Sequence, residues 1–246
     1  MSDRDRLRAE LVSIIATHKE GFASGTPESK RIDELIDALA PLTPYPNPMD
    51  HAQVFRGHWS GDYFNFGKLV GGSGSRDQGV GVTVSLKEFS MGRLPDIPAT
   101  FMASGLEIEP ESGAYNFVSQ FALGHNRVPS YHFAFAFYRR KEEQLDRFFV
   151  DFAGFRVAPV DQAMPMAEFA DAIGVDDPAL LSAELNPRAK LWSRVVYMDD
   201  DLRIQLGQLG GHYILLKTDR PMYSLDYWKP GARVTPMLGP PKSAAA

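Results

Sequence analysis

The sequence contains no cysteine among its 246 residues. This absence excludes a disulfide framework, a thiolate metal site and a cysteine nucleophile, and it suits a reducing cytosol. No apolar run approaches the roughly 18–20 residues that a membrane-spanning helix needs. The net charge of −5 argues against nucleic acid as a partner, because proteins that bind nucleic acid present a basic surface to the phosphates.

Several signatures of catalytic and metal sites are also missing. The segment Gly71–Ser75 is glycine-rich but lacks the Gly-Lys-Ser/Thr ending of a phosphate-binding loop, so it predicts a hairpin loop. No Gly-x-Ser-x-Gly motif offers a hydrolase nucleophile. No two of the six histidines have the spacing of three or four of a helical ligand pair, and Asp199–Asp201 predict a polar strand junction rather than a calcium loop. We therefore predict neither a metal nor a cofactor.

The first 50 residues predict two helices and a proline-rich linker. Residues 4–20 repeat apolar side chains at helical spacing, and Thr26-Pro27-Glu28 is typical of the start of a second helix. The apolar faces of the two helices consist of leucine and isoleucine: Leu7, Leu11, Ile14, Ile15, Ile32, Leu35, Ile36 and Leu39. Acidic residues near the N-terminus are atypical of targeting peptides. We expect a cytoplasmic protein, with peripheral membrane contact left open.

From Val54 onward the apolar period changes to two, which predicts β-strands separated by glycine, proline and serine turns. The expected strands are Val54–Phe66, Val80–Phe89, Thr100–Glu109, Ala114–Leu123, Tyr131–Arg140, Arg147–Phe152, Leu191–Met198, Leu202–Leu206, His212–Lys217 and Ser224–Trp228. Residues 164–185 interrupt this pattern with a short helix and an irregular insertion.

The order of these elements predicts the architecture. No β-α-β alternation is present, which argues against a doubly wound fold, and a closed barrel leaves no exposed strand edge. We predict a mainly-β, lipocalin-like antiparallel barrel over residues 51–230. The helices and linker of residues 1–50 would pack on it, and residues 231–246 would form a flexible tail.

Two residues far apart in the chain suggest how the barrel closes. Trp59 follows Gly57 at the start of the first strand, and Arg203 lies in one of the last strands. An arginine that lies across a tryptophan ring makes a cation–π contact and can plug one end of a small barrel. We predict that the two side chains lie within about 6 Å of each other, the range of such contacts. The alternative is two unrelated residues, one in the core and one solvated.

The same motifs resemble the plastid lipid-associated protein (fibrillin) family. The matching segments are Gly57-x-Trp59-x-x-x-Tyr63, Tyr197-x-Asp199-x-Asp201-Leu202-Arg203-Ile204-x-x-Gly207 and Tyr213-Ile214-Leu215-Leu216, in an order that holds over most of the chain. The resemblance implies a lipocalin-like barrel associated with lipids, carotenoids or prenylquinones, with no settled enzymatic role. Leu206 stands where the family has a second arginine, and the absence of a transit peptide suggests a bacterial-type member.

The strand at residues 131–138 alternates in side-chain size. Phenylalanines occupy one face, and smaller or polar residues occupy the other. If the second face points inward, its alanines leave space for a ligand; otherwise the alanines are filler in a packed core. The candidate ligand-binding residues are His132, Ala134, Ala136, Tyr138 and Tyr115.

The predicted function is binding or carriage of a hydrophobic small molecule: an isoprenoid, carotenoid, quinone or other lipid. One alternative is an isomerase or cyclase in which His132, Tyr138 or Tyr115 moves protons inside a dry lumen; the sequence favours a carrier over an enzyme. Another is a scaffold whose helices dock a partner enzyme. An enzyme needs two facing titratable groups, a carrier needs an apolar lumen, and a scaffold needs a filled lumen and an exposed leucine and isoleucine patch.

Overall fold

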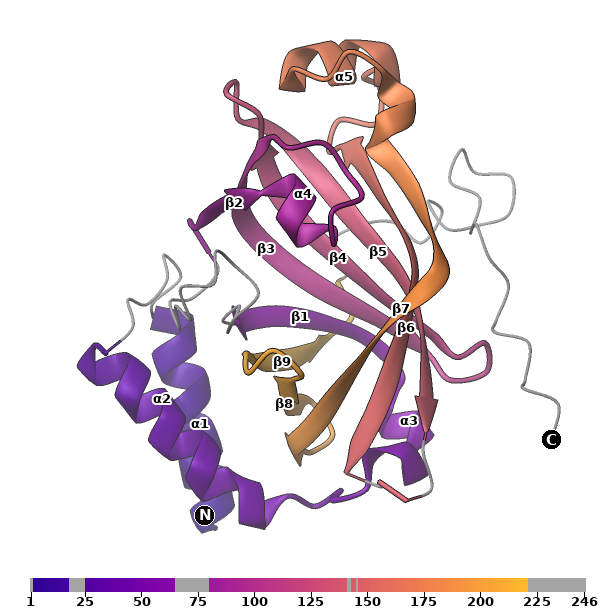
Figure 1. The fold of residues 1–246 in the computed structure, drawn as a ribbon. Helices are drawn as coiled ribbons and strands as arrows, with labels where there is room; N and C mark the ends of the chain where they lie inside the picture. The colour runs from indigo at the N-terminus through magenta and orange to yellow at the C-terminus, as the bar shows by residue number, and fades with distance from the viewer. Residues whose placement is uncertain (1, 18–24, 65–79, 141–142, 145, 221–246) are drawn as a thin grey trace, which may run out of the picture.

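Eight antiparallel strands close into a barrel (Figure 1). The structure is a computed structural model, and it describes residues 2–17, 25–64, 80–140, 143–144 and 146–220. The strands are β1 (Gly57–Phe64), β2 (Thr83–Ser85), β3 (Pro98–Glu109), β4 (Ala114–Leu123), β5 (Val128–Arg140), β6 (Arg147–Pro159), β7 (Ser182–Met198), β8 (Leu202–Gly207) and β9 (His212–Thr218). The predicted mainly-β antiparallel barrel with N-terminal helices is confirmed.

The ring closes through β1. The order β1-β9-β8-β7-β6-β5-β4-β3 is completed by a second pairing of β1 with β3, while the short β2 extends along the other stretch of β3. Gly61 of β1 lies opposite Ser104 of β3, where a Cβ atom would overlap the serine hydroxyl. Glycine at this position therefore allows the two strands to approach closely enough to close the barrel.

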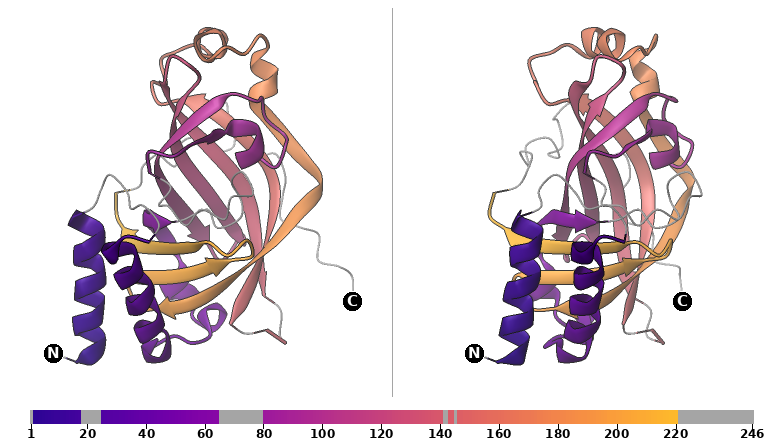
Figure 2. Two further views of the ribbon diagram at one scale, coloured as in Figure 1. Left: turned by 60° about the vertical axis from the view of Figure 1, so that its left-hand side comes forward. Right: turned by 90° about the vertical axis from the view of Figure 1, so that its left-hand side faces the viewer.

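Two helices cover the outside of the barrel along β8, β9 and β1 (Figure 2). They are α1 (Asp3–Thr17) and α2 (Pro27–Leu39), and the Thr26 side chain caps α2 by accepting from the Ser29 amide. Their apolar faces form a second core with the outer faces of the strands, comprising Leu11, Ile15, Ile32, Leu35, Ile36, Leu39, Tyr63, Tyr197, Leu202, Ile204 and Ile214. The patch that a docking scaffold would expose is thus turned inward in the described residues.

The remaining helical segments are short. They are η1 (Ala40–Leu42), η2 (Pro48–Asp50), α3 (Ala52–Phe55), α4 (Leu86–Phe89), α5 (Met166–Ile173) and η3 (Pro178–Leu181). The predicted interruption of the strand pattern within residues 164–185 corresponds to α5 and η3, which lie together at one end of the barrel (Figure 1). Across the parts of the chain that the structure describes, no helix has the length and apolar character needed to cross a membrane.

Several strand boundaries predicted from the sequence are wrong. Strand β6 runs to Pro159 rather than ending at Phe152, and β7 begins at Ser182, inside the predicted insertion, rather than at Leu191. Val54 and Phe55 belong to α3 rather than to the first strand, because turn η2 continues directly into another helical turn. Leu86–Phe89 forms α4 rather than the end of a strand. There the buried Ser90 hydroxyl donates to the Leu86 carbonyl oxygen and accepts from the Leu94 amide. These local hydrogen bonds stabilise a turn in place of a sheet ladder. The predictions for Gly71–Ser75, Ser224–Trp228 and residues 231–246 lie outside the described residues.

A polar junction attaches α1 to the turn between β7 and β8. Asp199 accepts hydrogen bonds from the Tyr197 hydroxyl (2.7 Å) and from the Leu202 amide (2.8 Å). Arg8 of α1 binds the same carboxylate at 3.0 Å and also contacts Asp201. The consecutive acids therefore form the predicted polar strand junction, and they also hold the helix against the barrel.

We expect Asp199→Asn to lower the free energy of unfolding by about 2 kcal/mol at neutral pH, since the carboxylate makes several charge-assisted hydrogen bonds. Burial raises the pKa of Asp199, but hydrogen bonds from Tyr197 and from the backbone, together with Arg8, outweigh burial and leave the pKa lowered. A carboxylate with a lowered folded pKa stabilises the protein above its unfolded pKa, and this contribution disappears as pH falls through the folded value. The difference in free energy of unfolding between the wild-type protein and Asp199→Asn should therefore become smaller below about pH 4.

Urea unfolding of both proteins across this pH range measures this difference. Asp200→Asn is the matched control, because Asp200 accepts its hydrogen bond from the Tyr45 hydroxyl at the exposed surface. Equal losses for the two variants would contradict the anchoring role of Asp199.

Candidate ligand site in the barrel lumen

Arg203 fills the end of the barrel next to α3. Its Cζ atom lies 4.5 Å from the centroid of the Trp59 ring and 4.5 Å from that of the Phe55 ring. Trp59 donates from Nε1 to the Phe55 carbonyl oxygen at 3.1 Å, which fixes the two rings relative to each other. The predicted contact between Trp59 and Arg203 is present, and Phe55 supplies a second ring that was not predicted.

The guanidinium group of Arg203 is fully buried. None of its three nitrogens has a hydrogen-bond partner within the described residues. Burial lowers the pKa of Arg203 to about 10, so the group remains charged at neutral pH. The aromatic faces of Phe55 and Trp59 are therefore what stabilises this cation.

Next to this plug lies a cluster of packed aromatic rings. The Tyr115 ring lies 6.2 Å from Phe55, 5.2 Å from Phe148 and 6.3 Å from Tyr138, measured between centroids. The Tyr115 hydroxyl donates to the Gln205 side-chain oxygen at 3.2 Å, and burial raises the pKa of Tyr115. These four rings lie outside the lining of an open space elsewhere in the lumen.

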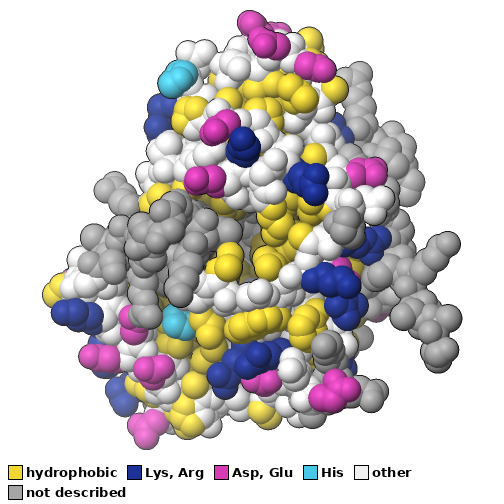
Figure 3. Space-filling view, in the orientation of Figure 1, with side chains coloured by type: hydrophobic (Ala, Val, Ile, Leu, Met, Phe, Trp, Pro, Cys, Tyr) yellow, Lys and Arg dark blue, Asp and Glu magenta, His cyan; other side chains and the backbone are white. Residues whose placement is uncertain are grey.

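That space is a cavity of about 130 Å³. It reaches the surface as a hollow bordered by hydrophobic side chains (Figure 3). Residues from all the strands from β3 to β9, from α4 and from the β8–β9 turn line it: Phe89, Met91, Ser104, Gly105, Leu106, Phe117, Ser119, His132, Ala134, Val150, Phe152, Phe155, Leu191, Trp192, Ser193, Gln205, Gly207, Gln208, Leu209, Tyr213 and Leu215.

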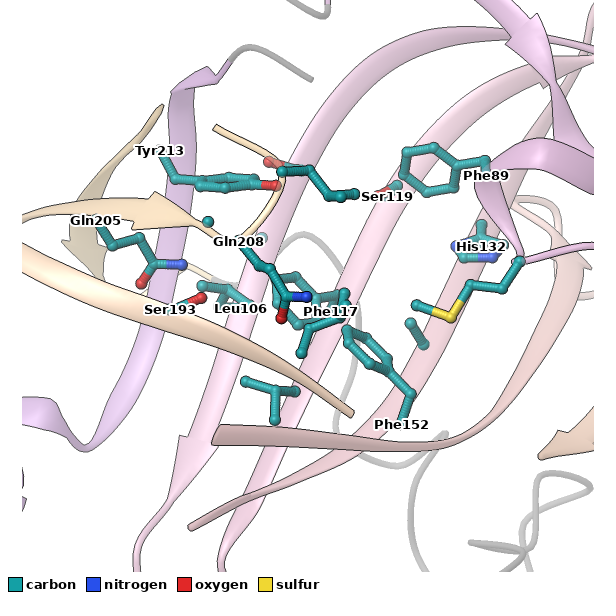
Figure 4. A pocket seen from close by; sticks show the side chains of 18 of the residues that line it. Phe89, Leu106, Phe117, Ser119, His132, Phe152, Ser193, Gln205, Gln208 and Tyr213 are labelled. Carbon is teal, nitrogen blue, oxygen red and sulfur yellow. The ribbon is translucent and has the colours of Figure 1, made fainter. Parts of the chain in front are cut away.

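The cavity has an aromatic middle and two polar ends (Figure 4). Phe117 and Phe152 lie in the middle with ring centroids 5.6 Å apart. Tyr213 and Gln205 lie at one end, whereas His132 lies at the other beside α4. Within the described lining no lysine, arginine, aspartate or glutamate is present. The site thus suits an uncharged, mostly apolar ligand, because a charge placed there would be desolvated without a partner.

His132 is enclosed by aromatic rings. It is 1% exposed, and the centroids of Phe89, Phe121 and Phe155 lie 5.1, 6.0 and 5.5 Å from that of its imidazole. Neither ring nitrogen has a hydrogen-bond partner in another described residue. Burial lowers the pKa of His132 to about 3, so the imidazole is neutral at physiological pH.

The described lining does not bring together the proton-transfer pair that an enzyme would need. Its titratable side chains are His132 and Tyr213, which lie at opposite ends of the cavity. Burial raises the pKa of Tyr213 to about 12. At neutral pH both groups are therefore uncharged, and neither has a pKa close to the value that suits a general acid or base.

The structure separates the five predicted ligand-binding residues into two groups. His132 and Ala134 line the cavity. Ala136, Tyr138 and Tyr115 instead belong to the packed core beside the plug. The pairing of β5 with β6 shifts between Phe135 and Ala136, so the strand pair bends where the open lumen gives way to this core.

The lining residues that come from turns and from α4 were not predicted from the sequence. Phe89 and Met91 lie in or just after α4, and Gln208 and Leu209 lie in the β8–β9 turn. A strand period carries no information on the direction of such side chains. No group of three or more histidine, aspartate or glutamate side chains in the described ranges is arranged to hold a metal ion. No protein-family model and no curated protein sequence matches the chain.

Proposed function

We propose that this protein binds and carries a hydrophobic small molecule of the class that includes isoprenoids, carotenoids, quinones and other lipids. The observation that carries the proposal is the apolar cavity among the strands, which opens to the surface and has no charged side chain in its described lining. The resemblance of the Trp59 and Arg203 motifs to the fibrillin family supports the same class of ligand.

The cavity volume limits how much of a ligand is enclosed. An engineered cavity of about 150 Å³ in another protein binds benzene, so about 130 Å³ suits one substituted ring or a short chain. A longer molecule would place its ring inside and extend its chain through the opening. Phe117 and Phe152 would contact the enclosed ring, since their own rings lie in the middle of the lumen.

We expect Ala134→Phe to abolish binding while the protein stays folded, because the new ring occupies the cavity that Ala134 lines. Titration with retinol and with a short-chain ubiquinone, followed by tryptophan fluorescence, measures binding, since Trp192 lies at the cavity. At least a tenfold loss of affinity is expected.

Ala136→Phe is the matched control. Ala136 is 1% exposed within the packed core, so the same substitution should overpack that core and cost about 1–3 kcal/mol. Unchanged affinity in folded Ala134→Phe, or no binding of either probe to the wild-type protein, would contradict the proposed carrier function.

A further inference from the structure

The imidazole of His132 is nearly inaccessible, and no other described residue offers it a hydrogen-bond partner. A neutral histidine has one nitrogen that donates a hydrogen bond and one that accepts. Neither nitrogen of His132 has a hydrogen-bond partner in another described residue, and three phenylalanine rings surround the imidazole. Buried polar atoms are rarely left in this state, because each unmade hydrogen bond costs free energy. An unpaired group of this kind that also lines a cavity points to a partner that enters from outside.

Ser119 places a second neutral polar group beside this histidine. It lies directly opposite His132 in the pairing of β4 with β5, and both residues line the cavity. Side chains of such cross-strand pairs are close neighbours on one face of a sheet. The end of the cavity next to α4 therefore offers an imidazole and a hydroxyl, while its walls are aromatic and aliphatic.

We infer that the ligand carries one uncharged hydrogen-bonding oxygen, a carbonyl or a hydroxyl, which is buried against His132 at the α4 end of the lumen. This inference rests on the proposed carrier function and narrows its ligand class to ketones, quinones and alcohols. A carboxylate fits poorly because the neutral imidazole supplies no positive charge, and the buried cation Arg203 does not line the cavity. A pure hydrocarbon would leave both nitrogens of His132 unpaired.

Probes of nearly equal shape distinguish the contribution of the oxygen to the affinity from the contribution of the apolar part of the ligand. Acetophenone and 1-phenylethanol carry the carbonyl and the hydroxyl, α-methylstyrene replaces the oxygen by a methylene group, and benzoate adds a charge. NMR titration of the backbone amides gives the affinities, and the side-chain ¹⁵N shifts of His132 report its hydrogen bond. We expect the wild-type protein to bind at least one oxygenated probe about fivefold more tightly than α-methylstyrene, the effect of one net hydrogen bond, and to bind benzoate most weakly.

His132→Leu should remove this preference and leave the affinity for α-methylstyrene within about twofold of the wild-type value. The matched control is His125→Leu, which makes the same change at an exposed turn outside the cavity lining and should keep the preference. Equal affinity of the wild-type protein for the oxygenated probes and α-methylstyrene would overturn the inference while leaving the carrier function standing. A preference that persists in His132→Leu, or tighter binding of benzoate, would also overturn it. Failure of all four probes and of retinol would instead count against the carrier function itself.

Discussion

Trp59→Ala is expected to lower the free energy of unfolding by about 3–5 kcal/mol, the usual cost of deleting a large buried ring. Trp59 is 1% exposed, and its ring is one of the two that face the Arg203 guanidinium. The substitution therefore removes apolar contacts and also one of the two groups that stabilise a buried cation. Because small proteins are stable by only about 5–15 kcal/mol, this one change should remove a large share of the total.

Denaturant midpoints at constant m-value measure the loss. Trp192→Ala is the matched control, since its partly exposed ring also has an arginine over it, with the Cζ atom of Arg147 4.7 Å from the centroid. That surface contact should contribute about 1 kcal/mol or less. Trp59→Phe should retain part of the stability because it keeps an aromatic face toward Arg203. Similar losses for Trp59→Ala and Trp192→Ala would show that the buried contact does not hold this end of the barrel together.

The second large effect is the dependence of stability on pH that His132 imposes. The folded pKa of about 3 lies below the ordinary value of 6.5. Between these values the unfolded chain binds a proton that the folded protein does not, so stability falls as pH falls. Relative to His132→Leu, the wild-type protein should lose about 3–4 kcal/mol between pH 6.5 and pH 3.5.

At neutral pH the same variant should be more stable than the wild-type protein by about 1–3 kcal/mol, since leucine leaves no buried polar atom unpaired. Guanidinium unfolding at several pH values gives both quantities, and the carboxylates common to the two proteins cancel in the difference. His125→Leu, with its exposed side chain, should follow the wild-type curve. If the free energy of unfolding depends on pH in the same way for the wild-type protein and for His132→Leu, the imidazole must gain a partner or a proton in the folded protein.

His132 lines the cavity and is expected to cost stability. Residues retained for function often cost stability, because they hold polar groups ready for a ligand. If the ligand supplies the missing partner, its binding should recover part of this cost and raise the unfolding temperature more in the wild-type protein than in His132→Leu.

Regular features of the fold were predictable from the sequence because they depend on short-range patterns. The period of two along β3 to β6 identified these strands, and the helical spacing in the first 40 residues identified α1 and α2. The contact of Trp59 with Arg203 was predicted from two short motifs, one at the start of the barrel and one in its last strands, and the structure contains this contact. The period of a helix or a strand determines, within a few residues, where each side chain points.

The lining of the cavity was predictable only in part. His132 and Ala134 follow from the alternation along β5, but the same alternation also nominated Ala136, which lies in the packed core. The register shift between β5 and β6 and the rings of Phe55 and Phe148 decide where the open lumen ends. Positions of this kind depend on contacts between segments far apart in the chain, which no local period encodes.

The position of β1 between β9 and β3 has a consequence for how the protein is made. His58 pairs with Glu107 on one side and with Thr218 on the other, so β1, the first of the described strands in chain order, needs β9, the last of them, as a partner. Folds dominated by such distant pairings form slowly. During synthesis one edge of β1 remains unpaired until β9 is complete, and an open strand edge is a site at which nascent chains aggregate. The risk of aggregation at this edge should therefore fall once β9 has emerged and paired with β1.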